Sequence, residues 1–545
     1  MQNENEEEYD VLIIGAGWYG LIAAYTYLKL EPETNLLIVD DGKTIGGVWS
    51  TERIYPDLFA QVGHGLFEYS FYPMKQTGLS PDRYISAQTI HDYLQSFAED
   101  HDLVRRIRLQ QRVTKAEKLG GKWVLTLNDG ASQVSGAKLI AATGVTSDPY
   151  MPDFPQKEFD KPIVHSSELA KVISHLTGPK VQRVTVLGAA KSAYDTAFML
   201  IKAGKQVDWI IRENGSGPLA IMPPRLMGVL NTVDVMATRA MASFSPAIMN
   251  TSGYCIFWAN AGLGLASAPD FWQTIHSGGL TVHRTEIEEF FDGDKVLLKN
   301  EQVLETDGVV LCTGWTDNLG LFDEATRVTY GLPSAADQGQ EWKNLDALAD
   351  MLVLEKLPLL KHSPNTVNAA STMKPWRLYR RMISPGMAAE GDRSVFFPGQ
   401  IHSVFTPLVA ELQALWGVAF MLGRLPVPDQ ADMMKEVAIS NAWTRRRYLE
   451  QGRKHAYYMY DYLSYIDTLA RDLGINTNRK SNMITEMFST YRPSDWRGLI
   501  DEFLAVEDKR QVNGNGKPMN GNGKYVNENG KYVNGNGKHM NGTRY

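Results

Sequence analysis

The stretch from Val11 to Asp40 reads VLIIGAGWYGLIAAYTYLKLEPETNLLIVD and decides the fold. An apolar run ends in glycine, a helical segment follows, and a second apolar run ends in an acid. This order predicts a strand, a turn, a helix and a second strand of a parallel sheet. Gly15, Gly17 and Gly20 form a GxGxxG turn, and Asp40 follows at the distance of about 20 residues where an acid binds ribose. We therefore expect a dinucleotide whose pyrophosphate lies at the helix N-terminus.

A second stretch of the same pattern runs from Arg183 to Arg212. The strand VTVLG leads into the turn GAAKSA at 188–193, a helical segment follows, and the strand QVDWIIR ends in Arg212. We expect Gly188, Lys191 and Ser192 to contact the phosphates of a second dinucleotide. A guanidinium where an NAD-type unit carries an acid predicts recognition of a 2′-phosphate. A solvated surface arginine and a turn that binds no nucleotide are the alternatives.

Composition narrows the class of protein. The chain carries 55 Lys and Arg against 62 Asp and Glu, a formal net charge of −7, and no long basic stripe, so no nucleic-acid partner is expected. Its 2 cysteines form no CxxC pair, which leaves a disulfide framework, a metal site and a dithiol redox centre unsupported. The acidic start MQNENEEEYD is unlike a secretory signal, and we expect a cytoplasmic protein.

Residues 240–269 contain no charged side chain. The length allows a membrane span, but interrupting Ser, Asn, Thr and Pro residues favour the lid or wall of a substrate pocket. Peripheral contact with a membrane surface is the second interpretation, and a true span is the third. A pocket lined in this way predicts an apolar small-molecule substrate.

Five further motifs follow along the chain, and their order and spacing support a family resemblance. They are GGVW at 46–49, ATGVTSDPYMP at 142–152, CTGW at 312–315, PGQ at 398–400 and ELQALW at 411–416. From about Tyr9 to Pro428 the chain resembles the flavin-containing monooxygenases and their Baeyer–Villiger relatives, the class B flavoprotein monooxygenases, in particular their fungal biosynthetic members. The resemblance implies FAD in the first unit and NADPH in the second. It also implies that the reduced flavin adds O₂ to form a C4a-(hydro)peroxyflavin, which oxygenates the substrate.

The resemblance also assigns residues. The expected cofactor-binding residues beyond the two glycine turns and the ribose acid are Tyr19, Gly47, Trp49, Gly144, Gly314 and Gln400. A loose alignment through Glu68 places His64 where the family has an asparagine beside the flavin, which makes His64 the candidate catalytic residue. A loop histidine that bonds only to backbone is the alternative.

The chain departs from the family at several positions. In the fingerprint FxGxxxHxxx plus aromatic, Phe159 and His165 match, whereas Lys161 replaces the glycine and Leu169 the aromatic residue. Ala190 replaces a glycine of the second turn. The fingerprint therefore does not choose between the branches of the family, and the extra methyl group of Ala190 predicts weaker or displaced NADPH binding.

These patterns predict an α/β fold of two Rossmann-like dinucleotide-binding domains, the NADPH domain inserted in the FAD domain, followed by a C-terminal helical region. The expected boundaries are 1–155 and 306–428 for the FAD domain, 156–305 for the NADPH domain with an apolar insert at about 216–270, 429–506 for the helical region, and 507–545 for a disordered tail of Asn, Gly and Lys repeats.

We therefore expect an FAD- and NADPH-dependent monooxygenase of fungal specialised metabolism that takes O₂ and an apolar small molecule. Hydroxylation, epoxidation, heteroatom oxidation and Baeyer–Villiger insertion stay open as reactions of the same cofactor. A flavin reductase or oxidase and a non-catalytic redox-sensing flavoprotein are the alternatives from other classes. Formation of an oxygenated product coupled to NADPH consumption distinguishes the monooxygenase hypothesis from these two alternatives.

Overall fold

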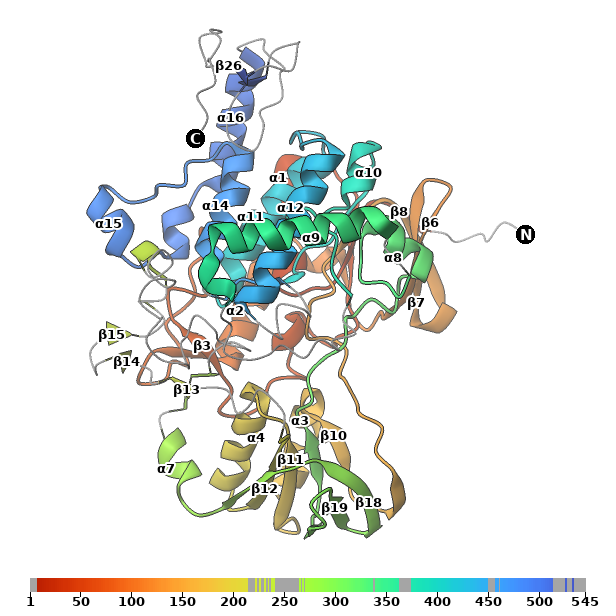
Figure 1. The fold of residues 1–545 in the computed structure, drawn as a ribbon, viewed down its shortest axis with the longest axis vertical. Coiled ribbons are helices and arrows are strands. Elements are labelled where there is room, and N and C mark those ends of the chain that lie inside the picture. Colours follow the sequence, from red (N-terminus) through yellow and green to blue (C-terminus); the bar gives the residue numbers. More distant parts are fainter. Residues whose placement is uncertain are drawn as a thin grey trace.

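The computed structural model describes residues 7–213, 221–222, 225–226, 230–231, 234, 237–240, 264–265, 267–268, 270–336, 339–361, 374–448, 456–459, 461–512, 525–526 and 532–533. These residues form two bodies, a larger one that holds both ends of the described chain and a smaller one (Figure 1). Two crossing segments join them: residues 142–155 lead into the smaller body, and residues 312–318 lead out of it. Each body is built on its own sheet, as the two glycine turns predict.

The sheet of the larger body has the order β5-β2-β1-β8-β7-β6, and β22 also pairs with β8. Its parallel part consists of short apolar strands, whereas β6, β7 and β8 run antiparallel. The strands are β1 (Glu7–Ile14), β2 (Leu36–Val39), β5 (Ile107–Arg108), β6 (Val113–Leu119), β7 (Lys122–Leu127), β8 (Ser132–Ala141) and β22 (Val395–Phe396). The predicted strand–turn–helix–strand unit is thus the centre of this sheet.

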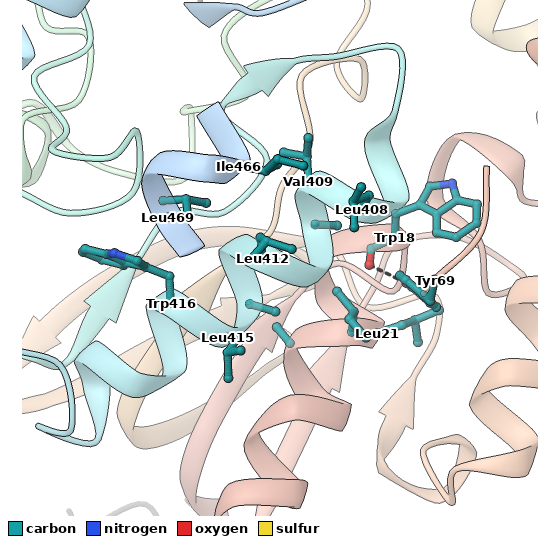
Figure 2. Packing of buried hydrophobic residues seen from close by; sticks show 14 of the residues in the cluster. Trp18, Leu21, Tyr69, Leu408, Val409, Leu412, Leu415, Trp416, Ile466 and Leu469 are labelled. Atoms are coloured by element: carbon teal, nitrogen blue, oxygen red, sulfur yellow. Dashed lines mark hydrogen bonds between the residues drawn. The ribbon is translucent and has the colours of Figure 1, made fainter. Parts of the chain in front are cut away.

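Two helices bury the first turn and the sheet. Helix α1 (Trp18–Leu30) packs against α11 (Thr406–Met421), which is buried along its whole length after Thr406. Figure 2 shows why: Leu415 of α11 lies toward α1, whereas Val409 and Trp416 lie toward α14 (Tyr462–Leu473). A helix that is apolar on every side must be covered on every side, so α11 forms the centre of the larger body.

The sheet of the smaller body is fully parallel, with the order β10-β21-β11-β12-β17. Its strands are β10 (Ile163–His165), β21 (Val309–Leu311), β11 (Arg183–Leu187), β12 (Gln206–Ile211) and β17 (Leu280–Arg284), covered by α3 (Leu169–Leu176) and α4 (Lys191–Lys202). A second, mostly antiparallel sheet joins β9 (Gln156–Phe159) to β18 (Ile287–Gly293), β19 (Lys295–Leu298) and β20 (Val303–Glu305).

This topology moves one predicted boundary. We expected the FAD domain to resume at residue 306, but β21 lies between β10 and β11 of the second sheet, so the return follows Leu311. The apolar sequence VVL is equally suitable for either parallel sheet, and only the pairing shows which sheet takes it. The boundary expected at 156 agrees with the start of β9.

The C-terminal part is helical, as predicted. Its main helices are α12 (Gln430–Arg447), α14 and α16 (Leu499–Val512), and α12 packs against α9 (Gly339–Lys356). Helix α16 continues to Val512, past the predicted start of the tail at residue 507, because EDKRQV still has good helix formers. Most of the predicted tail lies outside the described residues, although β25 (Tyr525–Val526) pairs with β26 (Tyr532–Val533).

Most of the predicted apolar insert at 216–270 also lies outside the described residues. Within it, β13 (Ile221–Met222) pairs in parallel with β16 (Gly264–Leu265). Among the helices of the described ranges, none is both long enough and apolar enough to cross a bilayer.

Candidate functional site

The first glycine turn contains two kinds of glycine. Gly15 has φ +102°, and a Cβ on it would lie 2.4 Å from the carbonyl oxygen of Ala142 at the end of β8. A Cβ on Gly20 would lie 1.8 Å from the carbonyl oxygen of Gly15, so α1 approaches the turn too closely for any side chain. Packing of the protein against itself therefore requires glycine at both positions.

Gly17 is different. Its φ of −96° suits any residue, and a Cβ on it would find no atom closer than the Cα of Gly47, at 3.6 Å. The protein itself leaves room for one methyl group at this position, in ordinary contact with the backbone of Gly46 and Gly47 at the N-terminus of α1. Packing therefore tolerates a methyl group here, and its absence clears space for a group that lies against the turn, which is the role that a pyrophosphate fills in this motif.

The Gly46-Gly47 pair lies against the first glycine turn. Gly46 and Gly47 have φ +131° and +59°, and the Gly46 N–H donates to the carbonyl oxygen of Ala16 over 3.0 Å. They begin the short helix η1 (Gly47–Trp49), and Trp49 packs edge-on against Phe67. The predicted GGVW motif thus forms the opposite side of a cradle whose floor is the GxGxxG turn.

Asp40 lies beside this cradle with both carboxylate oxygens engaged. Oδ2 accepts from the Ala16 N–H at 2.6 Å and Oδ1 from the Gly42 N–H at 2.8 Å. Burial raises the pKa of Asp40 above its ordinary value, against the effect of these two N–H donors. Since each carboxylate oxygen has two acceptor sites, Asp40 retains capacity for ribose hydroxyls.

Gln400 supplies an unpaired buried acceptor near the same helix. Its side chain is 2% exposed, its Nε2 lies 3.5 Å from Thr143 Oγ1, and its Oε1 has no partner. The preceding Gly399 approaches the Tyr19 ring so closely that a Cβ would lie 3.0 Å from it, and its N–H donates to Gln413. A buried acceptor without a donor is costly, so Gln400 fits a bound group that brings an N–H.

The two crossing segments between the bodies bind each other at Gly144 and Gly314. The Tyr150 N–H donates to the Gly314 carbonyl oxygen at 2.9 Å. Asn318 holds the other segment from both sides: its Nδ2 donates to the Gly144 carbonyl oxygen and its Oδ1 accepts from the Asp148 N–H. Both predicted glycines have positive φ, +72° and +89°, and lie where the chain passes between the dinucleotide units.

Three side chains meet at this crossing. The Arg53 guanidinium lies 5.0 Å over the Trp315 ring and donates to the Thr146 carbonyl oxygen at 2.9 Å. His165, from the end of β10, packs against the same indole, and its Nε2 lies 3.0 Å from the Gly314 carbonyl oxygen. Burial lowers the pKa of both His165 and Arg53. A neutral His165 donates from Nε2 to Gly314 and accepts at Nδ1 from the Ser167 N–H.

The sequence predicts only part of this cluster. His165 and Trp315 stand in motifs that the sequence singled out, but neither was expected as a site residue, and Arg53 was missed altogether. No spacing signals Arg53, because it enters from a loop of the first unit toward a segment more than two hundred residues later.

The second glycine turn repeats the backbone of the first. Gly188 has φ +138°, and a Cβ on it would lie 2.4 Å from the Cys312 carbonyl oxygen, as Gly15 does with Ala142. Ala190 caps α4 with φ −113° and ψ −171°, close to the −96° and −163° of Gly17. The methyl group of Ala190 therefore occupies the place that Gly17 leaves free.

The polar residues predicted to bind the second dinucleotide have different surroundings. Lys191 pairs with Asp195 one helical turn later, and Ser192 follows it in the first turn of α4. Arg212 is exposed one residue after β12 ends. Arg284, the last residue of β17, lies beside it across the sheet and donates to the Glu213 carbonyl oxygen. Two guanidinium groups thus stand at the carboxyl edge of the smaller sheet.

His64 bonds to backbone. Its Nε2 lies 2.9 Å from the Met74 carbonyl oxygen, and Arg83 approaches Nδ1 at 3.4 Å. Both ring nitrogens are therefore occupied, Nε2 by backbone as in the alternative interpretation and Nδ1 by the Arg83 side chain. The catalytic role of His64 stays a prediction.

Two sheets with parallel strands, each with a glycine turn between one strand and the helix that follows it, define an oxidoreductase class with two dinucleotide-binding units. The family described as pyridine nucleotide-disulphide oxidoreductase matches residues 12–225. Among solved structures, the S-allyl-L-cysteine S-oxygenase of Allium sativum matches 93% of this chain and 99% of its own, at TM-score 0.53 and 17% identity. Cyclohexanone monooxygenase of Rhodococcus sp. Phi1 bound to NADP+ matches 86% and 98%, at TM-score 0.52 and 16% identity.

Two curated relatives share a higher sequence identity with this chain than these structures do. FAD-dependent monooxygenase DEP4 of Fusarium langsethiae is 43% identical over 94% of this chain and 97% of its own length. DEP4 of Alternaria brassicicola is 45% identical over 91% and 95%. The chain belongs to the family of FAD-dependent monooxygenases. The predicted family, fold class and FAD dependence are confirmed.

Proposed function

We propose that this monooxygenase consumes NADPH and O₂ to place one oxygen atom on an apolar small molecule of fungal specialised metabolism. The observation that carries the proposal is the cradle between Gly17 and Gly47, with the unpaired acceptor of Gln400 near it. Both features fit FAD. FAD, when bound and reduced, supplies the activation of O₂.

The residues of the first unit divide the binding of FAD. The N–H groups at the start of α1 face the pyrophosphate, where the helix dipole favours negative charge. Asp40 would accept from ribose hydroxyls, and Gln400 Oε1, which has no partner in the protein, would accept from an N–H of the bound FAD. Tyr19 and Trp49 border the same cradle, and Gly144 and Gly314 turn the chain between the two units.

For NADPH, the support comes from the second turn and from the sheet edge beyond it. The Gly188 turn offers the same backbone as the FAD turn, and Arg212 stands exposed at the position that reads the ribose 2′-substituent. Ala190 reduces the room for the pyrophosphate by one methyl group, which argues for a displaced cofactor rather than for none. The fold match with an NADP+-bound monooxygenase agrees with this assignment.

Hydroxylation, epoxidation, heteroatom oxidation and Baeyer–Villiger insertion draw on the same cofactor chemistry, and nothing in the described residues selects among them. The uncharged sequence 240–269 favours an apolar substrate. No side chain of the described site is arranged as a nucleophile with an activating base. The protein's role is therefore to bind and orient the cofactor and the substrate and to exclude water.

The test compares metabolites of cells with and without the protein, then supplies the accumulated precursor to the purified enzyme with NADPH under ¹⁸O₂. We expect a product that gains one labelled oxygen atom for each NADPH consumed. Label that arrives only from H₂¹⁸O, or NADPH consumption that leaves the precursor unchanged, would favour the oxidase or reductase alternative. A Gly17→Val protein serves as the flavin-free control.

A further inference from the structure

A cavity of about 260 Å³ lies in the helical region, bordered by α12, α14 and the turn 378–381. It is separate from the flavin cradle, because none of the glycine-turn residues, Asp40 or Gln400 lines it. Its volume is just below the ~300 Å³ at which ligand pockets usually begin, which suits a small organic molecule.

The turn that borders the cavity carries two buried arginines. Arg380 and Arg381 are 8% and 4% exposed, and both adopt left-handed backbone, with φ +51° and +61°. Left-handed backbone at two consecutive residues with long side chains is unfavourable, and the surrounding structure must hold it in place. The turn thereby directs both guanidinium groups toward the same part of the interior.

Only one of the two has a counter-charge. Arg380 binds Asp472 through two nitrogens, at 2.6 and 3.0 Å, and also pairs with Glu436. Among the described residues, Arg381 binds neutral groups only: the Asn441 side-chain oxygen at 2.5 Å and the Thr444 hydroxyl at 3.5 Å. Arginine stays protonated in proteins, so Arg381 is a buried cation without a carboxylate.

Neighbouring arginines show how unusual this is. In the same region Arg377 pairs with Asp346, Arg445 with Asp350 and Arg447 with Asp461. Buried charges in proteins are paired or hydrogen-bonded to opposite charge, because desolvation of an isolated ion is expensive. Arg381 lines the cavity, so a ligand in the cavity is placed to supply the missing anion.

The rest of the cavity wall selects the body of that ligand. Trp443, Tyr458 and Tyr465 form a continuous aromatic surface, with ring centroids 5.2 Å apart between the first two and 5.1 Å between the last two. Tyr465 already uses its hydroxyl on Gln413 and on the Arg380 carbonyl oxygen. These three aromatic side chains all line the cavity, and an aromatic lining favours an apolar or aromatic body.

We propose that this cavity binds a small carboxylic acid, with its carboxylate on Arg381 and its apolar body against Trp443, Tyr458 and Tyr465. A planar guanidinium matches a planar carboxylate through paired hydrogen bonds. A phosphate fits less well, because its second negative charge would meet Glu436 at the cavity border with no further free cation there. The inference goes beyond the oxygenation reaction and does not depend on it.

The test measures binding of benzoate to the FAD-loaded full-length enzyme by titration calorimetry, with benzamide and inorganic phosphate as further probes. We expect one saturable benzoate site, and no site of similar affinity for benzamide or phosphate. Arg381→Gln keeps a hydrogen-bonding side chain toward Asn441 but removes the charge, and should weaken benzoate at least tenfold. Arg445→Gln, which removes an arginine outside the cavity, should bind benzoate as the wild type does.

Several results would overturn the proposal: no saturable benzoate binding to the wild-type enzyme at millimolar concentration, equal binding of benzamide, preference for phosphate, or full benzoate affinity in Arg381→Gln. Flavin content and thermal unfolding of each variant establish that it is folded and loaded. Because Arg381→Gln leaves the glycine cradle intact, benzoate bound near the flavin would persist in it and would be recognised as such. Trp443→Leu should weaken benzoate without abolishing charge selectivity, and an unchanged affinity there would remove the aromatic wall from the site.

Discussion

The imidazole of His165 lies edge-on to the indole of Trp315, with ring centroids 4.9 Å apart and an interplanar angle of 78°. His165 ends a strand of the smaller body, whereas Trp315 belongs to the segment that returns to the larger one. Arg53 of the larger body covers the same indole. A contact among three side chains therefore joins the two dinucleotide units at the crossing.

Replacing Trp315 with leucine should loosen this crossing without touching the glycine turns. Loss of the aromatic and cation–π contacts should lower the free energy of unfolding by about 1–3 kcal/mol. The rate of flavin reduction by NADPH, measured by stopped flow, should fall while FAD content stays full. Trp272→Leu, at an exposed tryptophan of the smaller body, is the control and should change neither quantity. An unaltered reduction rate in Trp315→Leu would mean that other contacts set the orientation.

The three glycines of the first turn should respond differently to alanine. Gly17→Ala should fold normally but retain less FAD, because the added methyl group makes only ordinary contacts in the protein itself, the shortest at 3.6 Å to the Cα of Gly47. Gly17→Val should abolish FAD retention. Gly20→Ala should lose stability, because its Cβ would lie 1.8 Å from the Gly15 carbonyl oxygen. Flavin absorbance of purified protein and urea unfolding separate the two effects, with Gly320→Val as a control in open space.

Full flavin content in Gly17→Val would contradict the assignment of the cradle. Equal destabilisation by Gly17→Ala and Gly20→Ala would show instead that the turn is required only for packing.

The sequence predicts the first unit well because its signals are local. Val11–Asp40 contains strand, turn, helix and acid within one continuous stretch, and each residue type has a backbone or packing reason to be there. Val309–Leu311 was placed in the wrong sheet, since an apolar triplet carries no information on its neighbours. Arg53 and Arg381 were missed for a similar reason: their partners are distant in sequence, and an arginine in a loop is usually a surface residue.

Glu411 should make stability depend on pH. It is 5% exposed, accepts from the Ser70 N–H and hydroxyl, and burial raises its pKa from 4.5 to about 7. The folded state then binds the proton more tightly than the unfolded state. The contribution is complete below the unfolded pKa and is lost as pH rises through about 7, a total of about 3 kcal/mol.

Glu411→Gln preserves an acceptor for Ser70 and removes the titration. We expect urea unfolding at pH 8 to show a more stable variant, and the difference from wild type to shrink toward pH 5. Glu355→Gln, at an exposed carboxylate, should follow the wild-type profile. Parallel profiles for Glu411→Gln and the wild type would show that Glu411 does not titrate in this range.

Truncation should be tolerated after Val512 and not before Glu507. Arg424 lies 3.6 Å from Glu507, which belongs to α16, so a chain that ends at Val506 loses this pair and the last turns of the helix. A chain that ends at Val512 should keep its FAD and its turnover, because it retains α16 to its last residue together with the Arg424–Glu507 pair. Flavin content and NADPH oxidation compare the two. Strong loss in the longer chain would show that the tail packs on the enzyme.

Arg212 should determine the preference for NADPH over NADH. Strands of a parallel sheet bring their carboxyl ends to one edge, and Arg212 follows β12 at that edge, beyond the Gly188 turn. Paired, charge-assisted hydrogen bonds to a 2′-phosphate contribute roughly 1.5–3 kcal/mol each, or about tenfold or more in affinity. Arg212→Ala should therefore raise the Michaelis constant for NADPH at least tenfold and that for NADH little, as measured by steady-state flavin reduction.

The matched control is Arg183→Ala, because Arg183 is also exposed but begins β11, at the opposite edge of the same sheet. It should leave the ratio of the two Michaelis constants as it is in the wild type. If Arg212→Ala also leaves that ratio unchanged, Arg284 becomes the residue to replace, since it ends the neighbouring strand in register with Ile211. A loss of preference only in the Arg284 variant would move the 2′-phosphate to the outer strand of the sheet.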